Sequence, residues 1–293
     1  MNDRKGIYAA LVLTALTYAG SPYFVKVAIE NAPPMTVVFM RFSFAVFFLL
    51  PFVVEEKNRL HRPSKKTLAR MVTLGILGMF LYHYLFFAAL QYTSPLSVAI
   101  ITSIMPLAAS IIATIEGVER LFLSRIAMML LSVVGILIVM SEGSIKTLQE
   151  IRFNRGDLMM LVGTLFFAWY NVGCRSILTK YPPLFTAFFF TVVTAAFSFP
   201  FFLQEVASVR WEAPSIWIAG VYTGLFPSAL GLYIQQLGIQ RIGVSRAVGF
   251  NNLIPVFSVV ISLFVFGIDS VKPTHLVGMA IIIPCVLWNA RIK

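Results

Sequence analysis

Charged residues are scarce in this sequence. Only 12% of its 293 residues are Asp, Glu, Lys or Arg, against about a quarter in an ordinary soluble protein, and 59% are hydrophobic. This shortage of charge excludes a soluble globular domain. Runs of about 20 apolar residues, the length that crosses a hydrocarbon core of about 30 Å, can be placed ten times along the chain. We therefore predict an all-α polytopic membrane protein with ten transmembrane helices at 6–29, 33–54, 70–90, 95–115, 124–141, 157–180, 183–203, 216–238, 244–266 and 273–290.

Sequence motifs for catalysis and for nucleotide binding are also missing. The chain has no Walker phosphate loop, no His-Glu-x-x-His and no Gly-x-Gly-x-x-Gly. Its three histidines and two cysteines are too few for a metal cluster, and Cys174 and Cys285 both fall inside predicted spans, where inert packing is the simplest reading. We expect no enzymatic activity, no metal and no cofactor.

The net charge of +11 follows membrane topology and does not indicate nucleic-acid binding. Apart from three basic residues inside spans, the N-terminus, the even-numbered connections and the C-terminus hold 15 Lys or Arg, and the odd-numbered connections hold 5. Basic loops stay on the cytoplasmic side. We expect a multi-pass protein of the cell (inner) membrane with both termini in the cytoplasm, whose partners are the lipid bilayer and a small-molecule metabolite.

The chain repeats itself at a shift of 149 residues, from 75 to 224. The segment 75–115, two apolar spans joined by a short polar link, aligns without gaps with 224–264; Pro106, for example, falls on Pro255. A fixed period of this kind indicates a duplicated unit. We divide the chain into a first unit at 1–145 and a second at 146–293. Each unit holds five spans, so the second must enter the membrane from the opposite side, and such inverted repeats are typical of secondary transporters.

Two ionisable residues are predicted near the middle of the membrane. Arg41 lies eight residues into the second span, about 12 Å deep at 1.5 Å per residue. An ionised side chain there costs at least about 2.5 kcal/mol, so it must face a partner or a watery cavity. Arg41 either lines the substrate path or braces helices through carbonyl contacts. His83, within Tyr82-His83-Tyr84, is either a substrate or proton ligand or a neutral histidine with a structural hydrogen bond.

Three prolines are predicted to break spans. Pro22 follows Tyr18-Ala19-Gly20-Ser21 in the first span, while Pro106 and Pro255 interrupt the fourth and ninth spans near mid-membrane. A proline in a helix leaves the carbonyl four residues earlier without its donor. Polar side chains stand beside the two repeated breaks, and we predict that they bind substrate unless the prolines only shape the helices. These side chains are Thr102, Ser103, Asn251 and Asn252.

Aromatic and amide groups complete the predicted site. Trp169 and Asn171 lie in the sixth span at the depth of the break in the first, and Tyr84 and Tyr233 are equivalent positions in the two repeats. No Asp or Glu falls within a span except at its edge. A cationic drug or a carboxylate-based ion relay therefore suits this inventory poorly, whereas an anionic or zwitterionic solute suits it well.

The sequence resembles the drug/metabolite transporter superfamily in its EamA branch over nearly its whole length. In the first half the resemblance depends on Arg41 and on the run 89–95 leading to Pro106 and then Glu119-Arg120. In the second half it depends on the run 238–243 leading to Pro255 and then Gly267-Ile268-Asp269. The resemblance implies secondary active transport, commonly export of amino acids or related metabolites, through a central cavity between the halves.

The leading hypothesis is thus an exporter of a small zwitterionic or anionic metabolite that works by alternating access. An uptake carrier or exchanger of the same fold is the first alternative. A membrane enzyme acting on lipid-linked substrates, or a passive channel, is the alternative from another class. Saturable counterflow distinguishes a carrier from a channel, and product formation distinguishes both from an enzyme. The oligomeric state is not predicted.

Overall fold

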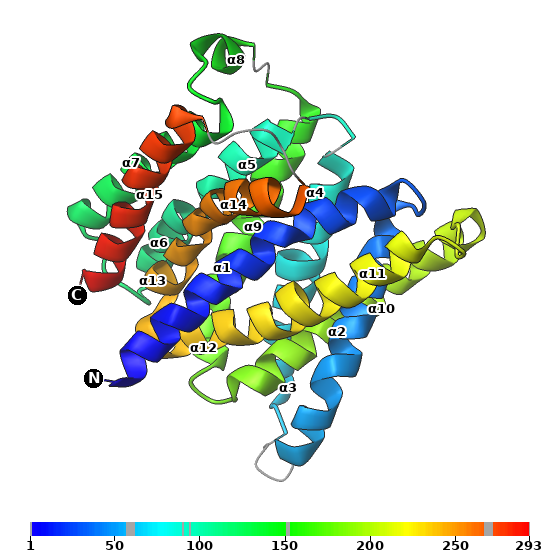
Figure 1. Cartoon of the computed structure of the whole chain (residues 1–293). Coiled ribbons are helices and arrows are strands. Elements are labelled where there is room, and N and C mark those ends of the chain that lie inside the picture. The colour runs from blue at the N-terminus through cyan, green and yellow to red at the C-terminus, as the bar shows by residue number, and fades with distance from the viewer. Residues whose placement is uncertain are drawn as a thin grey trace.

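The computed structural model describes residues 2–56, 62–89, 91–93, 95–150, 153–266 and 272–292, and every regular element in these ranges is a helix (Figure 1). In the first half they are α1 (Asn2–Ile29), α2 (Pro34–Glu56), α3 (Lys65–Thr73), η2 (Leu74–Phe80), α4 (Leu81–Ala89), α5 (Pro95–Ser103), α6 (Met105–Ile115) and α7 (Leu123–Met140). The second half has α8 (Ile145–Gln149), α9 (Arg155–Ile177), α10 (Pro183–Glu205), η3 (Val206–Ser208), α11 (Pro214–Thr223), η4 (Gly224–Gly231), α12 (Leu232–Ile242), α13 (Val244–Gly249), η5 (Phe250–Leu253), α14 (Ile254–Phe266) and α15 (Pro273–Arg291).

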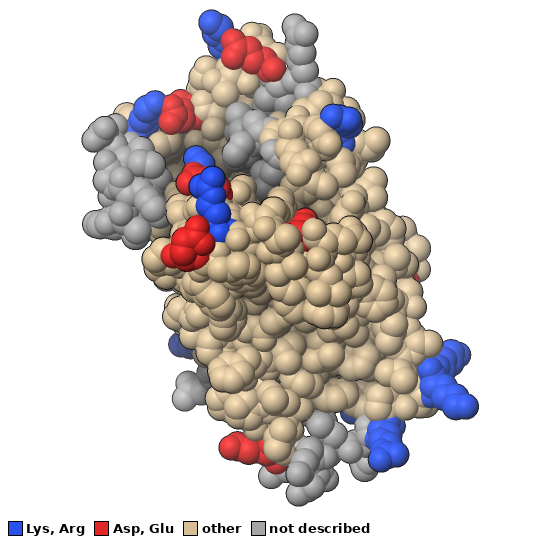
Figure 2. Space-filling model, turned by 90° about the vertical axis from the view of Figure 1, so that its right-hand side faces the viewer, with Lys and Arg blue, Asp and Glu red and all other residues tan. Residues whose placement is uncertain are grey.

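Ten helical stretches within the described ranges are long and apolar enough to cross a membrane, as the sequence predicts. They run from Lys5–Ile29 to Pro273–Arg291, and most ends lie within a few residues of the predicted ones. Figure 2 shows that, on the face in view, charged side chains gather toward the two ends of the molecule and leave a broad uncharged band between them. Such a band is what the hydrocarbon core requires. The chain is a multi-pass membrane protein.

The two repeats meet through equivalent helices. α2 packs along α10, its equivalent in the second repeat, and α7 packs along α15 in the same way. Both chain ends lie on one side of the bundle, which we call the terminal face, and the short helix α8 between the repeats lies on the other, the opposite face (Figure 1). This arrangement, with five spans in each repeat, makes the repeats inverted, as the sequence predicts.

The first helix of each repeat packs into the other repeat. α1 lies against α11, η4, α12 and α14, which all belong to the second repeat, whereas α9 lies against η2, α4, α5 and α6 of the first. We call these two sets the α1 bundle, which also includes α13 and η5, and the α9 bundle. The structural halves that face one another are therefore not the two halves of the sequence, and this exchange was not predicted.

Several spans are interrupted at repeat-equivalent positions. The third and eighth spans each contain a π-helical segment, η2 and η4, and these widened turns were not predicted. In the fourth span α5 ends at Ser103 and α6 begins at Met105, so Pro106 stands in the first turn of a new helix. Pro255 has the same place in α14, which follows the 3-10 turn η5.

Pro22 does not end its helix. α1 continues from Asn2 to Ile29 with Pro22 inside it, in contrast to the break expected in the first span. A proline withholds a single N–H group and the helix continues on both sides when neighbouring carbonyls find other donors. Tyr222 of α11 donates to the Thr17 carbonyl oxygen at 3.2 Å, one residue before Tyr18, whose carbonyl loses its donor to Pro22. A hydrogen bond from α11 therefore holds α1 just before Pro22, and the helix continues through the proline.

Candidate functional site

Arg41 lies inside the bundle and touches three helices. Its Nε donates a hydrogen bond to Ser228 Oγ of η4 at 2.5 Å, and its Nη1 lies 3.4 Å from Ser21 Oγ of α1. The guanidinium carbon also lies 5.6 Å from the centre of the Phe42 ring. None of the ion pairs found within the described ranges involves Arg41. Among the described residues, the hydrogen-bond partners of Arg41 are hydroxyl groups, and Arg41 keeps part of its surface accessible.

The widened turn η4 places Ser228 opposite Arg41. Gly224 opens this turn at the crossing with α2, where an added Cβ would lie 2.9 Å from the Arg41 carbonyl oxygen. A side chain at position 224 would therefore push α2 away and separate Arg41 from Ser228. π-helical turns inside α-helices are frequent at functional sites. Gly224 and Pro227 are the distinctive residues of this turn in the sequence, but neither points to Arg41 by itself.

His83 is buried next to the same part of α2. Its Nδ1 lies 2.8 Å from the carbonyl oxygen of Met79, and its ring meets the edges of Phe42 and Tyr82 at centroid distances of 4.8 and 5.0 Å. A carbonyl oxygen can only accept, so Nδ1 carries a proton, and in the neutral ring Nε2 is then the acceptor. The structure therefore brings Arg41 and His83, the two ionisable residues of the predicted site, to one place.

Two tyrosines belong to this cluster and were missing from the predicted site. Tyr82 of α4 meets the His83 ring at 5.0 Å between ring centres, and Tyr18 lies one helical turn before Ser21 in α1. Tyr82 stacks on Phe167 of α9 at 4.4 Å between ring centres, and Tyr18 packs where Gly231 leaves room beside α12. We call Tyr18, Ser21, Arg41, Tyr82, His83 and Ser228 the central cluster. It joins the α1 bundle to the α9 bundle, with α2 between them.

The polar residues beside the fourth-span break satisfy their own helix. Thr102 donates to the Val98 carbonyl oxygen at 2.8 Å, and Ser103 donates to the Ile100 carbonyl oxygen at 2.6 Å. Such local hydrogen bonds bend helices and leave the hydroxyl oxygen free to accept. No described hydrogen bond joins either residue to Arg41, so their part in binding stays a prediction.

The two asparagines of the ninth span lie on the turn η5. Asn252 is buried, and its Nδ2 donates to Ser132 Oγ of α7 at 3.0 Å, which ties η5 to a helix outside the α1 bundle. Asn251 is half-buried on the same turn. The hydrogen bond of Asn252 is sufficient to explain its burial, while Asn251 remains a predicted ligand.

The predicted aromatic residues are dispersed. Tyr84 packs on Phe201 of α10 at 5.6 Å between ring centres, among other phenylalanines. Trp169 and Tyr233 are half-buried and pack against the main hydrophobic core. The structure gives none of these three a contact with Arg41 or His83. Asp269, quoted for the family resemblance, lies outside the described residues.

A layer of buried amides lies at the contact between α9 and α12. Gln236 donates from Nε2 to the Tyr170 hydroxyl at 2.7 Å and approaches Cys174 Sγ at 3.5 Å. The Oε1 of Gln236, the Oδ1 of Asn171 and both amide atoms of Gln235 are buried without a protein partner. We call Tyr170, Cys174 and Gln236, together with their buried chain neighbours Asn171 and Gln235, the amide layer. Of these residues only Asn171 was predicted as a ligand, because single glutamines carry no distinctive spacing.

The described part of the chain offers no group of three His, Cys, Asp or Glu side chains that could hold a metal ion. The site instead consists of one guanidinium, one imidazole, several hydroxyls and a nearby amide layer. These groups donate hydrogen bonds to an anion and supply one positive charge, without any nucleophile paired with a base.

The sequence profile of the EamA-like transporter family matches residues 4–141 and 154–290, one copy for each repeat. This chain belongs to the EamA-like transporter family. An uncharacterized transporter of Bacillus subtilis, YyaM, is 28% identical over 284 residues, which cover 96% of this chain and 92% of the relative. A solved crystal structure shares the fold at a TM-score of 0.79 and 20% identity, over 95% of each chain.

Another relative carries a substrate in its name. The "probable terminal-alkyne amino-acid exporter" of Streptantibioticus cattleyicolor is 22% identical over 281 residues, which cover 96% of this chain and 92% of the relative. The matched family and these relatives are transporters, so this chain is a transporter and not an enzyme.

Proposed function

We propose that this family member exports a small zwitterionic or anionic metabolite, such as an amino acid, by alternating access, and that the central cluster binds the anionic group of the substrate. The observation that carries the proposal is Arg41, a cation inside the bundle whose described partners are hydroxyl groups. An arginine with no carboxylate partner binds carboxylate or phosphate well, because its N–H groups match two oxygens at once.

The charge inventory supports the sign of the substrate. All 12 acidic residues of the sequence lie outside the spans or near their ends, so no carboxylate competes for Arg41 at mid-depth. The neutral form of His83 offers an acceptor for an ammonium group on the same molecule. Export is the direction named for the amino-acid exporter relative. The basic connections support a terminal face in the cytoplasm of a cell membrane.

The test compares small molecules released into the medium by cells that produce the wild type, Arg41→Ala or Lys26→Ala at matched membrane levels. Lys26 is the control because it is an exposed cation near the end of α1. We expect one metabolite with a carboxylate to be enriched with the wild type and with Lys26→Ala. Release should fall at least about tenfold with Arg41→Ala, since hydrogen bonds to charged groups are worth about 1.5–3 kcal/mol.

Full release of that metabolite by folded Arg41→Ala protein would show that the site is wrongly assigned. Uptake in place of release, measured with the labelled metabolite, would show that the direction is wrong while the site stands. Loss of release in both variants would indicate a general effect of removing basic residues and would count against the proposal.

A further inference from the structure

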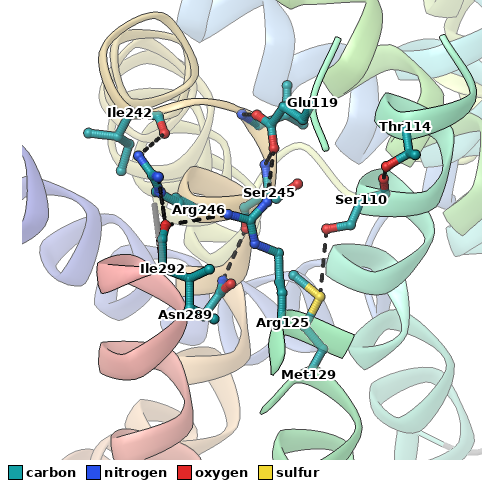
Figure 3. Close-up of polar contacts among 11 residues, drawn as sticks. Ser110, Thr114, Glu119, Arg125, Met129, Ile242, Ser245, Arg246, Asn289 and Ile292 are labelled. Atoms are coloured by element: carbon teal, nitrogen blue, oxygen red, sulfur yellow. Dashed lines mark hydrogen bonds and ion pairs between the residues drawn. The ribbon is translucent and has the colours of Figure 1, made fainter. Parts of the chain in front are cut away.

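Polar contacts on the terminal face join the two bundles, and Figure 3 shows their centre at the start of α13. Glu119 follows α6, in the connection to α7, and its carboxylate accepts hydrogen bonds from backbone N–H groups of the second repeat. Oε1 lies 2.5 Å from the Val244 nitrogen and Oε2 lies 3.3 Å from the Ser245 nitrogen. The α1 bundle is thus held by a side chain attached to the end of the α9 bundle.

The backbone at this contact is shaped to receive the carboxylate. Gly243, between α12 and α13, has φ 92° and ψ 166°, a conformation that only glycine adopts readily. An added Cβ at position 243 would lie 2.5 Å from Glu119 Oε1, so the absence of a side chain is what lets the carboxylate approach. Gly243 ends the run 238–243, on which the family resemblance partly depends, so this contact gives that run a physical role.

A buried arginine completes the cluster. Arg125 of α7 lies 3.4 Å from Glu119 Oε2, with its side chain 4% exposed, and its Nη2 reaches toward the Ile292 carbonyl oxygen at 3.5 Å. Arg246 of α13 donates to the same Ile292 oxygen from Nε at 2.9 Å and from Nη2 at 2.6 Å. Glu119 therefore neutralises one of two arginines that would otherwise repel one another here.

The amide layer is a second tie between the same two bundles. Tyr170 belongs to α9 and Gln236 to α12, so their hydrogen bond crosses from one bundle to the other. The helices α6 and α13, α9 and α13, and α9 and α12 also pack against one another on this side. Buried amide atoms without partners destabilise the closed layer, and exposure to water would relieve that cost.

We propose that Glu119 is the latch of a gate on the terminal face, closed in this state, and that releasing Glu119 from α13 opens the amide layer to the solution. α13 belongs to the α1 bundle, which carries half of the central cluster, and it packs against α6 and α9 of the other bundle. The contacts of α13 therefore lie where the two bundles would part. Parting of the two bundles at Glu119 would give the central cluster access to the terminal face, as alternating access requires. The gate has a purpose only in the transport function proposed above, on which this inference rests, but the test of the gate needs no substrate.

Cys174 is a built-in reporter of the gate. It is fully buried in the amide layer beside Gln236, and the chain's only other thiol is Cys285. In a Cys285→Ala background, a membrane-impermeant thiosulfonate reagent added to one membrane face measures access to Cys174 alone. Inside-out vesicles present the terminal face under the proposed orientation, and spheroplasts present the opposite face.

Three variants separate the latch from general loosening. Glu119→Gln removes the charge but keeps the shape, and Val244→Pro removes one donor N–H at the first position of α13, where proline is tolerated. Glu116→Gln is the matched control, because Glu116 also lies at the end of α6 and pairs with Arg70 at 4.0 Å, yet has no contact with α13 among the described residues.

We expect Glu119→Gln and Val244→Pro to raise the modification rate of Cys174 from the terminal face by about tenfold or more, because each removes a charge-assisted hydrogen bond. Glu116→Gln should react at the parental rate. Parental rates in both latch variants would overturn the proposal, as would equal increases from both faces. A faster reaction from the terminal face alone, combined with no metabolite release by the wild type, would support the gate and refute the proposed export.

Discussion

Replacing Arg41 by glutamine should change which molecules the transporter prefers, beyond reducing its rate. Glutamine keeps hydrogen-bonding atoms near Ser228 but removes the positive charge from the central cluster. The charged guanidinium donates to a carboxylate more strongly than to a neutral amide, and hydrogen bonds to charged groups contribute about 1.5–3 kcal/mol. A neutral hydrogen bond still contributes about 0.5–1.5 kcal/mol, so the surplus is about 1–1.5 kcal/mol. Since 1.4 kcal/mol is a factor of ten, the wild type should favour a carboxylate over its carboxamide by about 5-fold to 12-fold.

The assay is counterflow in proteoliposomes with the metabolite identified by the release experiment. Unlabelled carboxylate and the corresponding carboxamide compete with the labelled metabolite, and the ratio of their inhibition constants is compared between variants. We predict that this ratio falls to near one in Arg41→Gln. Ser228→Ala is the matched control, because it removes the 2.5 Å contact to Arg41 Nε and leaves the charge in place.

The comparison has a definite negative outcome. If Arg41→Gln transports and keeps the wild-type ratio, Arg41 does not bind the carboxylate and serves only to brace α1, α2 and η4. If Ser228→Ala abolishes the preference as completely as Arg41→Gln, positioning by η4 matters as much as charge, and the reasoning from charge alone is wrong.

Two further predictions concern stability. Gly243→Ala should lower the free energy of unfolding by about 1–3 kcal/mol through backbone strain, and it should also displace Glu119. Thermal unfolding in detergent measures this effect, with Gly6→Ala as the control because nothing obstructs a Cβ there. An unchanged melting temperature of Gly243→Ala would contradict the geometry. The Lys272 ammonium holds the pKa of Glu142 below its usual range by hydrogen bonding on the opposite face. A lowered folded-state pKa stabilises the protein above the unfolded pKa, and this stabilisation is lost as the pH falls through the folded-state pKa. The wild type should therefore be more stable than Glu142→Gln by less than about 1 kcal/mol at pH 7, and the difference should shrink as the pH falls below about 4 and vanish below the folded-state pKa. A difference that grows on acidification would refute this.

The sequence predicts the spans well because each span is determined locally. A run of apolar residues must be helical in lipid, and prolines such as Pro106 and Pro255 lie where the helices restart. Neither argument depends on which helices become neighbours. The same reasoning overestimated Pro22, because α1 continues through it while packed against distant parts of the chain, such as Tyr222, which donates to the Thr17 carbonyl.

The contacts of the site could not be predicted in this way. Arg41 and Ser228 are 187 residues apart, and Glu119 and Val244 are 125 apart, so both pairs depend on how the bundles exchange their first helices. The free-energy cost of burying a charge in the membrane correctly predicts that Arg41 needs partners, but it does not predict which hydroxyl groups those partners are. The π-helical turn that carries Ser228 has no sequence rule beyond its glycine and proline.

The helix breaks occur in both repeats, whereas Arg41, His83 and Ser228 of the central cluster each occur in only one. The widened turns and proline breaks occur in both repeats, whereas the shift of 149 residues places Phe190 opposite Arg41, Leu232 opposite His83 and Met79 opposite Ser228. A carrier that opens alternately to two faces needs equivalent joints in both halves, because each half must undergo the same change in reverse. A single substrate with one anionic group needs only one cation. The duplicated features are therefore expected to control access, and the unduplicated ones to control selectivity.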